Sequence, residues 1–366
     1  MSYTERKTFY ECLSQKRNNP LVTYVTSIRP NLGCNMASDA IAQIIQQIRM
    51  IPAEYDSIDF LIISNGGDPI TALRIMSLLR ERFSKITVLL PYVAYSAATI
   101  LSLGADEIIM HPYSNLGPVD PQLSVAHNTE KGVREHLNFS SEDLRNYVDF
   151  IRSDVGITDQ QHLVAAVSPL IKDVGALPIG SAKRSQQLSL TLSEKMLGWH
   201  FSDNAKIKSI AKSLISSYYH HGYAVGRKEA TDIGLPIVSP DQETEDLLWK
   251  IWEDFEHEMK CQDSFDIIKE IKNDPDASQK LSQIPVVMLP ANTPPDVAKQ
   301  IIIQRAQATP VTMQSAIKKR VLIGSIESVN LAKAVYNDID IVYWRNADYS
   351  LGFNCTITAS GWIDYN

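Results

Sequence analysis

The sequence predicts an α/β protein with a parallel sheet covered by helices, a helical insertion and a small C-terminal α+β appendage. Apolar runs alternate with amphipathic helical stretches between residues 21 and 112. A charged helical stretch follows, and strand-like runs fill the C-terminal end. Repeated strand–helix–strand units build parallel sheets, whose strands are buried on both faces and read as continuous apolar runs.

The elements of the predicted sheet alternate in chain order. Ile41, Ile44, Ile45 and Ile48 recur at helical spacing in the first helical stretch. Asp68 and Pro69 have the residue types of an N-cap and a first helical residue. The strand-like runs are residues 21–27, 57–64, 86–91 and 107–112, and the helical stretches are residues 38–51, 70–83 and 97–105.

Residues 86–105 carry no charge, and a stretch of about 20 apolar residues could cross a bilayer. Pro91 lies inside this stretch, followed by Tyr92, Tyr95 and Ser96. A proline interrupts a continuous helix, so the segment reads as a buried strand, a turn and a buried helix. We therefore expect no membrane span.

The chain divides into four expected parts. Residues 1–20 form an N-terminal helical extension, and residues 21–260 form the main domain, with a helical excursion over 123–180. Residues 261–295 are polar and interrupted by Pro and Asp, which indicates a linker. Residues 296–366 combine one helical stretch with short strand-like runs, which predicts a small α+β domain.

Composition excludes several classes of protein. The 366 residues include 35 Lys and Arg against 42 Asp and Glu, so the net charge of −7 disfavours a nucleic-acid partner. The histidines lack metal-ligand spacing, and we expect neither a metal nor another cofactor. The N-terminus has no apolar signal segment. The cysteines form no CxxC pair, which favours a reducing cytoplasm; they are Cys12, Cys34, Cys261 and Cys355.

Two adjacent strand ends carry candidate chemistry. Gly66 and Gly67 follow one strand, and Ser96 stands between the next strand and its helix. Glycines let backbone N–H groups approach a ligand closely, and Ala97 begins a helix with a free N–H. Ligand sites of parallel α/β sheets lie at this carboxyl edge. Taken alone, Ser96 also reads as an ordinary N-cap serine.

The motif ISNGGDP, followed by PYVAYSAATILSLGADEIIMHPYSNLGPVDPQL, resembles the serine dehydrogenase proteinase family. This family is related to signal peptide peptidase A and the Clp proteolytic subunit within the Clp–crotonase superfamily. The resemblance covers residues 21–235 and implies a Clp–crotonase-like fold of ββα repeats. It also implies a serine peptidase with Ser96 as nucleophile and an oxyanion hole from Gly66, Gly67 and Ala97.

The general base has more than one candidate. The resemblance implies the chain order Ser, Asp, His, with Asp120 and His221 completing a triad with Ser96 and His220 as the neighbouring alternative. A plain reading makes Asp120 a turn residue before a proline and His221 a surface residue. The competing Ser–Lys dyad needs a lysine base, for which Lys183 is the best-placed candidate.

Two further classes of function stay open. A crotonase-type enzyme would use the same oxyanion hole on an acyl-CoA, and a non-catalytic scaffold would keep only the fold. The expected substrate is a peptide or protein. Superfamily members commonly form rings or stacked oligomers, so the resemblance implies a homo-oligomer. The chain has no P-loop motif, so any ATP-driven unfolding would need a separate partner.

Overall fold

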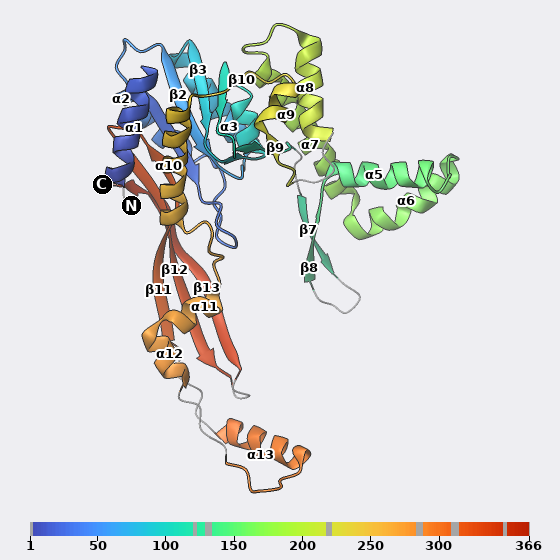
Figure 1. The fold of residues 1–366 in the computed structure, drawn as a ribbon. Helices are drawn as coiled ribbons and strands as arrows, with labels where there is room; N and C mark the ends of the chain where they lie inside the picture. Colours follow the sequence, from blue (N-terminus) through green and yellow to red (C-terminus); the bar gives the residue numbers. More distant parts are fainter. Residues whose placement is uncertain are drawn as a thin grey trace. The chain divides into compact units, whose positions relative to one another are not determined.

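The computed structural model describes residues 3–119, 123–128, 134–216, 222–282, 288–308, 315–346 and 350–365. The chain forms two compact units, each built from several segments (Figure 1). The first unit comprises Met1–Thr26, Cys34–Asp254 and Ile326–Ala332, and the second comprises Ser27–Gly33, Phe255–Ser325 and Lys333–Asn366.

The first unit contains the predicted parallel sheet. Its strands lie in the order β10-β5-β3-β2-β1, and every neighbouring pair is parallel. Both faces are covered, since all six residues of β1 and the last six of β2 are buried. The strands are β1 (Leu21–Thr26), β2 (Ser57–Ile63), β3 (Lys85–Leu90), β5 (Glu107–Met110) and β10 (Ile237–Val238).

The helices of this unit begin and end close to the predicted limits. Ile41 and Ile44 are buried on α2, as their spacing indicates. Asp68 caps α3 and Pro69 is its first residue, which confirms both predicted roles. The helices outside the insertion are α1 (Tyr3–Arg17), α2 (Ala40–Met50), α3 (Pro69–Arg82), α4 (Ala97–Ser102), α9 (Arg227–Asp232) and α10 (Gln242–Met259).

The uncharged segment 86–105 folds as strand, turn and helix. It contains β3, the two-residue strand β4 (Val93–Ala94) and α4. Every residue of α4 is buried, which explains the absence of charge. Over the described residues, no single helix is long and apolar enough to cross a membrane, although the bent pair α6 and α7 passes on length and composition together.

The insertion begins as a β-hairpin, where the sequence predicts helices. β7 (Leu123–Asn128) and β8 (Arg134–Phe139) pair antiparallel, and helices follow them. Gly198 ends α7 and separates it from α8. The helices are α5 (Ser141–Ser153), α6 (Gln160–Val174), α7 (Ala176–Leu197) and α8 (Asn204–Ser216).

A second, very small sheet joins three distant parts of the chain. Its strands lie in the order β4-β6-β9, where β6 is Asn115–Leu116 and β9 is Val225–Gly226. Ala94 pairs with Leu116 in a parallel register, and Leu116 pairs with Val225 in an antiparallel register. Each of these strands is two residues long, and β4 begins two residues before Tyr95.

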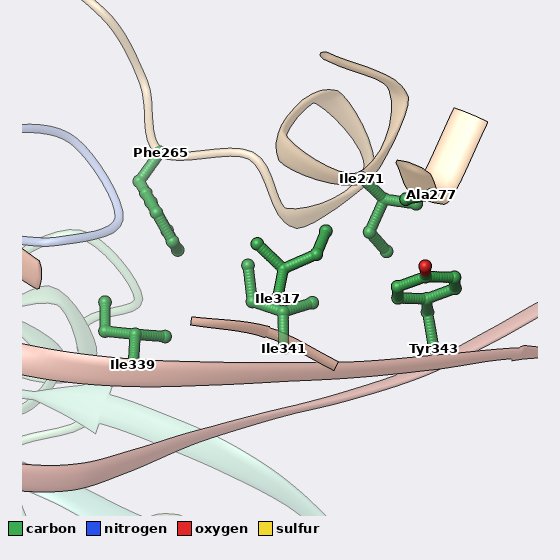
Figure 2. Packing of buried hydrophobic residues seen from close by; sticks show 7 residues of the cluster. All are labelled: Phe265, Ile271, Ala277, Ile317, Ile339, Ile341 and Tyr343. Carbon is green, nitrogen blue, oxygen red and sulfur yellow. The ribbon is translucent and has the colours of Figure 1, made fainter. Parts of the chain in front are cut away.

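The second unit packs two short helices on a long antiparallel ladder (Figure 2). Phe265, Ile271 and Ala277 contact a cluster that includes Ile339 and Ile341. The elements are α11 (Ile267–Asn273), α12 (Pro275–Ser282), α13 (Pro295–Ala308), β11 (Ser315–Glu327), β12 (Ala332–Arg345) and β13 (Leu351–Asp364).

Residues 261–295, where the sequence indicates a linker, therefore hold α11 and α12. The Asp and Pro residues that interrupt this segment serve as helix starts. Asp266 accepts hydrogen bonds from the N–H groups of Ile268 and Lys269 at 2.8 and 3.2 Å. Asp274 precedes Pro275 and accepts one from Ala277 at 2.9 Å. Such residues cap helices as readily as they break them.

A buried ionic cluster ties the N-terminal helix to the rest of the first unit. Arg6 contacts Asp254 at 2.6 Å and Glu327 at 2.7 and 3.1 Å. Tyr10 donates its hydroxyl to Glu327 at 2.7 Å. Burial and the nearby carboxylate raise the pKa of Tyr10 well above its ordinary value. A bidentate arginine in such a setting fixes geometry as well as charge.

Candidate active site

Ser96 has a backbone conformation that serine rarely adopts. Its φ is 52° and its ψ is −115°, between β4 and the first residue of α4. It holds the N-cap position of α4, yet its side chain makes no capping hydrogen bond. A strained turn from strand to helix is also the device that exposes nucleophilic serines in other folds. The hydroxyl is therefore left available for chemistry.

Gly66 lies directly against this serine. Its φ is +99°, and a Cβ placed on it would lie 2.9 Å from Cβ of Ser96, 2.9 Å from N of Ala97 and 2.5 Å from O of Tyr95. Only a residue without a side chain fits there. The glycine loop and the serine turn are thus in direct contact, as the sequence predicts for two neighbouring strand ends.

The N–H of Gly66 is committed within the protein. It donates to Oγ of Ser64 at 3.0 Å, and Thr26 donates its hydroxyl to the same oxygen at 2.7 Å. Ser64 also accepts from Tyr95 N through its carbonyl at 2.9 Å. Ser64 therefore holds the glycine loop and the serine turn together. The N–H of Gly66, predicted as an oxyanion donor, is therefore engaged with Ser64 in this structure.

Gly67 is held by the segment before α2. N of Met36 donates to O of Gly66 at 2.7 Å, and N of Asp68 donates to O of Met36 at 2.9 Å. With φ at +148°, a Cβ on Gly67 would lie 2.4 Å from O of Met36. Over the part of the chain that the structure describes, the N–H groups of Gly67 and Ala97 have no hydrogen-bond acceptor.

A threonine fixes the strand before Ser96 to the segment after β6. Oγ1 of Thr99 lies 2.7 Å from O of Ala94 and 2.9 Å from O of Gly117. N of Gly117 donates to O of Ala94 at 2.9 Å. Gly117 packs flat against the ring of Tyr95, since a Cβ there would lie 2.4 Å from it.

Three of the predicted site residues, Asp120, His220 and His221, lie outside the described residues. The segments beside them are described. Leu116 precedes Asp120 by four positions, and Val225 follows His221 by four. Leu116 pairs with both Val225 and Ala94, and Ala94 is two residues before Ser96. N of Val119 also donates to O of Leu214 at 2.9 Å.

Lys183 is exposed on α7, where Nζ donates to Oε1 of Gln186 at 3.2 Å. It lines a cavity of about 300 Å³ formed by α5, α7 and α8, together with Glu142 and Lys208. The residues that line this cavity do not include Ser96 or the glycine loop. Lys183 therefore stands among solvated charges of the insertion.

Two other histidines have perturbed environments. Burial lowers the pKa of His111, whose ring stacks on Trp249 with centroids 4.8 Å apart. Burial also lowers the pKa of His200, whose Nε2 donates to O of Leu103 at 2.8 Å. No group of three or more metal-binding side chains was found among the described residues.

The family comparison covers the centre of this site. Residues 34–174 match the family described as ClpP-like SDH-type serine proteinase. The match includes both glycines, Ser96 and Asp120, and ends before Lys183 and His221. An uncharacterized protein of Methanocaldococcus jannaschii is 27% identical over 198 residues, which is 53% of this chain and 56% of that protein. The chain thus spans little more than half of that relative.

Solved structures give weaker similarities. A serine-to-alanine mutant of 1510-N membrane-bound stomatin-specific protease is 15% identical, with 62% of this chain and 82% of that chain covered and a TM-score of 0.33. ClpP1 from Listeria monocytogenes is 13% identical, with 63% and 99% covered and a TM-score of 0.33.

The family match and the observed topology agree on the class of fold. The parallel sheet β10-β5-β3-β2-β1, with its helical insertion after β6, is the Clp–crotonase-like architecture that the resemblance implies. Of the second unit, the sequence also predicted the helix and strands after residue 296, but not α11 and α12. Residues 34–174 are thus similar in sequence to the ClpP-like SDH-type serine proteinases.

Proposed function

We propose that the protein is a serine peptidase with Ser96 as its nucleophile. One observation carries this proposal: the hydroxyl of Ser96 makes no capping hydrogen bond to α4, and a strained backbone holds the residue directly against Gly66. Two uncommitted backbone N–H groups, those of Gly67 and Ala97, stand on the two loops that meet there. A nucleophile beside backbone donors is the arrangement that acyl transfer requires.

Each step has a named group. Oγ of Ser96 attacks the peptide carbonyl carbon and loses its proton to the general base. The oxyanion of the tetrahedral intermediate accepts hydrogen bonds from Gly67 and Ala97. The base then gives the proton to the leaving amine as the C–N bond breaks. Water, deprotonated by the same base, cleaves the resulting ester and regenerates the Ser96 hydroxyl.

We assign the base to His221, oriented by Asp120. A neutral imidazole accepts a proton near pH 7, and a neighbouring carboxylate fixes its tautomer. The small sheet β4-β6-β9 supports this assignment. This sheet holds Ala94, Leu116 and Val225 side by side. Ala94 lies two residues before Ser96, Leu116 four before Asp120, and Val225 four after His221. Four residues of extended chain reach at most about 14 Å.

The Ser–Lys dyad is the alternative mechanism. Lys183 would need to be buried beside Ser96 in order to act as a neutral base. Its exposed position and its contact with Gln186 favour the histidine instead. Acyl-CoA chemistry and a non-catalytic scaffold remain outcomes that the following experiments would reveal.

The nucleophile is tested by active-site labelling. A fluorophosphonate probe should label the wild-type chain, and Ser96→Ala should abolish the labelling because the attacking oxygen is gone. Ser102→Ala removes another serine of the same helix and should leave the labelling intact. Full labelling of Ser96→Ala would refute the assignment.

The base is tested by hydrolysis of a fluorogenic peptide. His221→Ala should reduce kcat by about 1000-fold or more, since the nucleophile is then no longer activated. Lys183→Ala and His220→Ala should retain activity within about threefold. Normal hydrolysis by His221→Ala together with loss in Lys183→Ala would replace the triad with the dyad.

The setting of the enzyme is also a proposal. We place it in the cytoplasm as a homo-oligomer acting on peptide or protein substrates, with any unfolding motor on a separate chain. Its scattered cysteines suit a reducing compartment. Mass measurement of the purified chain in solution should give a multiple of 40.9 kDa, and a monomer at micromolar concentration would contradict the oligomer.

A further inference from the structure

The second unit ends in an edge strand beside an apolar groove. Within the described ladder β11-β12-β13, the strand β13 pairs with β12 along one side and has no strand on its other side. A cavity of about 510 Å³ borders this open edge. We call the cavity and the adjoining residues 351–357 of β13 the edge groove.

Among the described residues, the open edge carries neither charges nor prolines, two of the usual protections of sheet edges. Between Leu351 and Ile363, β13 contains no charged residue and no proline. Its neighbour β12 carries Asp338, Asp340 and Arg345 over a similar length. Natural proteins blunt exposed edges with charges, prolines or a covering element, because free N–H and C=O groups recruit further strands. An unprotected edge of this length therefore suits a strand-shaped ligand.

The floor and wall of the edge groove are apolar. Phe265 precedes α11, Ile267 is the first residue of that helix, and Ile339 comes from β12. Figure 2 shows Phe265 above the strand that carries Ile339. On β13, Phe353 and Ile357 line the cavity and remain 39% and 54% exposed. These large side chains would lose contact with water if a ligand filled the groove.

The pleat of β13 determines which of its side chains point into the groove. Phe353, Cys355 and Ile357 all line the cavity, so alternate residues point into it. The ladder to β12 is regular along this stretch and becomes irregular between Asp338 and Ile339, beyond Ile357. A partner strand paired with residues 351–357 would place its own alternate side chains on the same face.

The electrostatics restrict the ligand to an uncharged segment. Asp266 is the single charged residue among those that line the cavity. Its carboxylate already caps α11 by accepting from Ile268 and Lys269. Away from Asp266, a charged side chain buried against this apolar lining would lose hydration without gaining an ion-pair partner.

We propose that the edge groove binds an extended, uncharged polypeptide segment with apolar side chains at alternate positions. The segment adds a strand to residues 351–357 of β13 and inserts its apolar side chains beside Phe265, Phe353 and Ile357. Backbone hydrogen bonds supply affinity, and the groove supplies selectivity for apolar residues. The proposal does not rest on the peptidase assignment, because it concerns binding by the other unit.

The test uses the full-length chain with Ser96→Ala, so that a bound peptide is not cleaved. The probe is a fluorescein-labelled, acetylated and amidated heptapeptide, Thr-Val-Thr-Val-Thr-Val-Thr, followed by fluorescence anisotropy. A second peptide carries N-methyl groups on its valine nitrogens, which keeps the side chains and removes alternate backbone donors. Two further variants, Ile357→Lys and Thr356→Lys, place the same charge on opposite faces of the strand.

We expect saturable binding that Ile357→Lys weakens at least about tenfold, with Thr356→Lys close to the parent. The N-methylated peptide should bind at least about tenfold more weakly than the parent peptide. No saturation up to about 1 mM peptide would overturn the proposal. So would equal effects of the two lysine variants, or equal binding of the two peptides. The chain could instead dimerise through the edge groove. Dimerisation that is abolished by Ile357→Lys and is not inhibited by the peptide would assign the groove to a second copy and overturn the proposal.

Discussion

Ser96 and Gly66 form a pair in which each residue determines what the other can be. The serine adopts a positive φ, which costs backbone strain, and the glycine leaves room for its Cβ. Ser64 connects them, since its hydroxyl accepts from Gly66 and its carbonyl accepts from Tyr95. The local geometry of the proposed nucleophile is thus set by three residues on two loops.

Replacing Gly66 by alanine should disable the site. The new Cβ would collide with O of Tyr95 and N of Ala97, and the backbone would be strained at φ +99°. We expect the rate of fluorophosphonate labelling to fall by about 100-fold, as for other small displacements of reacting groups. Gly180→Ala, where nothing lies within 4 Å, is the control and should label normally.

His111 should make stability dependent on pH. Burial lowers its pKa below the ordinary 6.5, and the positive charge of Arg227 lowers it further. The carboxylates of Glu245 and Asp246 have the opposite effect but do not outweigh burial. The unfolded chain then binds the proton more readily. The stabilising contribution is complete above pH 6.5 and is lost as the pH falls towards the folded pKa.

Urea denaturation between pH 7.5 and 5.0 measures this effect. His111→Asn keeps an acceptor for the N–H of Tyr113 without the titration, so its free energy of unfolding should fall less with pH. His257→Asn changes an exposed histidine of α10 and serves as the control. An unchanged slope in His111→Asn would contradict the assignment to His111.

At the scale of elements, α3 begins at the glycine loop and depends on its cap. Asp68 accepts hydrogen bonds from Ile70 and Thr71 at 3.0 and 3.2 Å. Asp68→Ala should lower the free energy of unfolding by about 1 kcal/mol, and Asp68→Asn, which is an equally good cap, should cost much less. Urea midpoints of the two variants provide the measurement, and equal losses would argue against a capping role.

The sequence predicted the elements whose burial is continuous. The charge-free run 86–105 and Pro91 identified β3, the turn and α4, because burial leaves a local pattern. It could not reveal that Asp266 and Asp274 cap α11 and α12, since the same residue types also mark linkers. The hairpin of β7 and β8 was missed for a similar reason, because polar strands carry little apolar periodicity.

The candidate site was predictable to the extent that it follows the order of parallel strands. That order places Gly66 beside Ser96 and Ala97, and the sequence identified all three. The role of Ser64 depends on a hydrogen bond to the loop that follows it. Its signal in the sequence was a polar residue at the end of a buried strand. The assignments of Asp120 and His221 stay predictions.

At the scale of the molecule, the buried cluster of Arg6 connects α1 with two distant segments of the first unit. Removing the arginine leaves the carboxylates of Glu327 and Asp254 buried without their main counter-charge. Arg6→Met should therefore lower the free energy of unfolding by about 3–5 kcal/mol. Such a cluster was invisible in the sequence, because Arg6 lies 248 positions before Asp254 and 321 positions before Glu327.

A double variant distinguishes charge from packing. Arg6→Met combined with Glu327→Met should lower the free energy of unfolding by less than the sum of the two single changes. The second change removes the buried carboxylate whose arginine the first change removed. Guanidinium unfolding of the four chains completes the cycle. Strict additivity would show that the groups contribute independently.

The three-stranded sheet β4-β6-β9 has a consequence for the stability of the proposed triad. Each strand contributes two residues, whereas β2 of the parallel sheet has seven. Short ladders open at a small fraction of the global free energy. Parting β6 from β4 and β9 would separate the nucleophile turn from the chain segments that lead to Asp120 and His221, with the core left folded. Local opening of this small sheet would thus interrupt the proposed triad without unfolding of the parallel sheet.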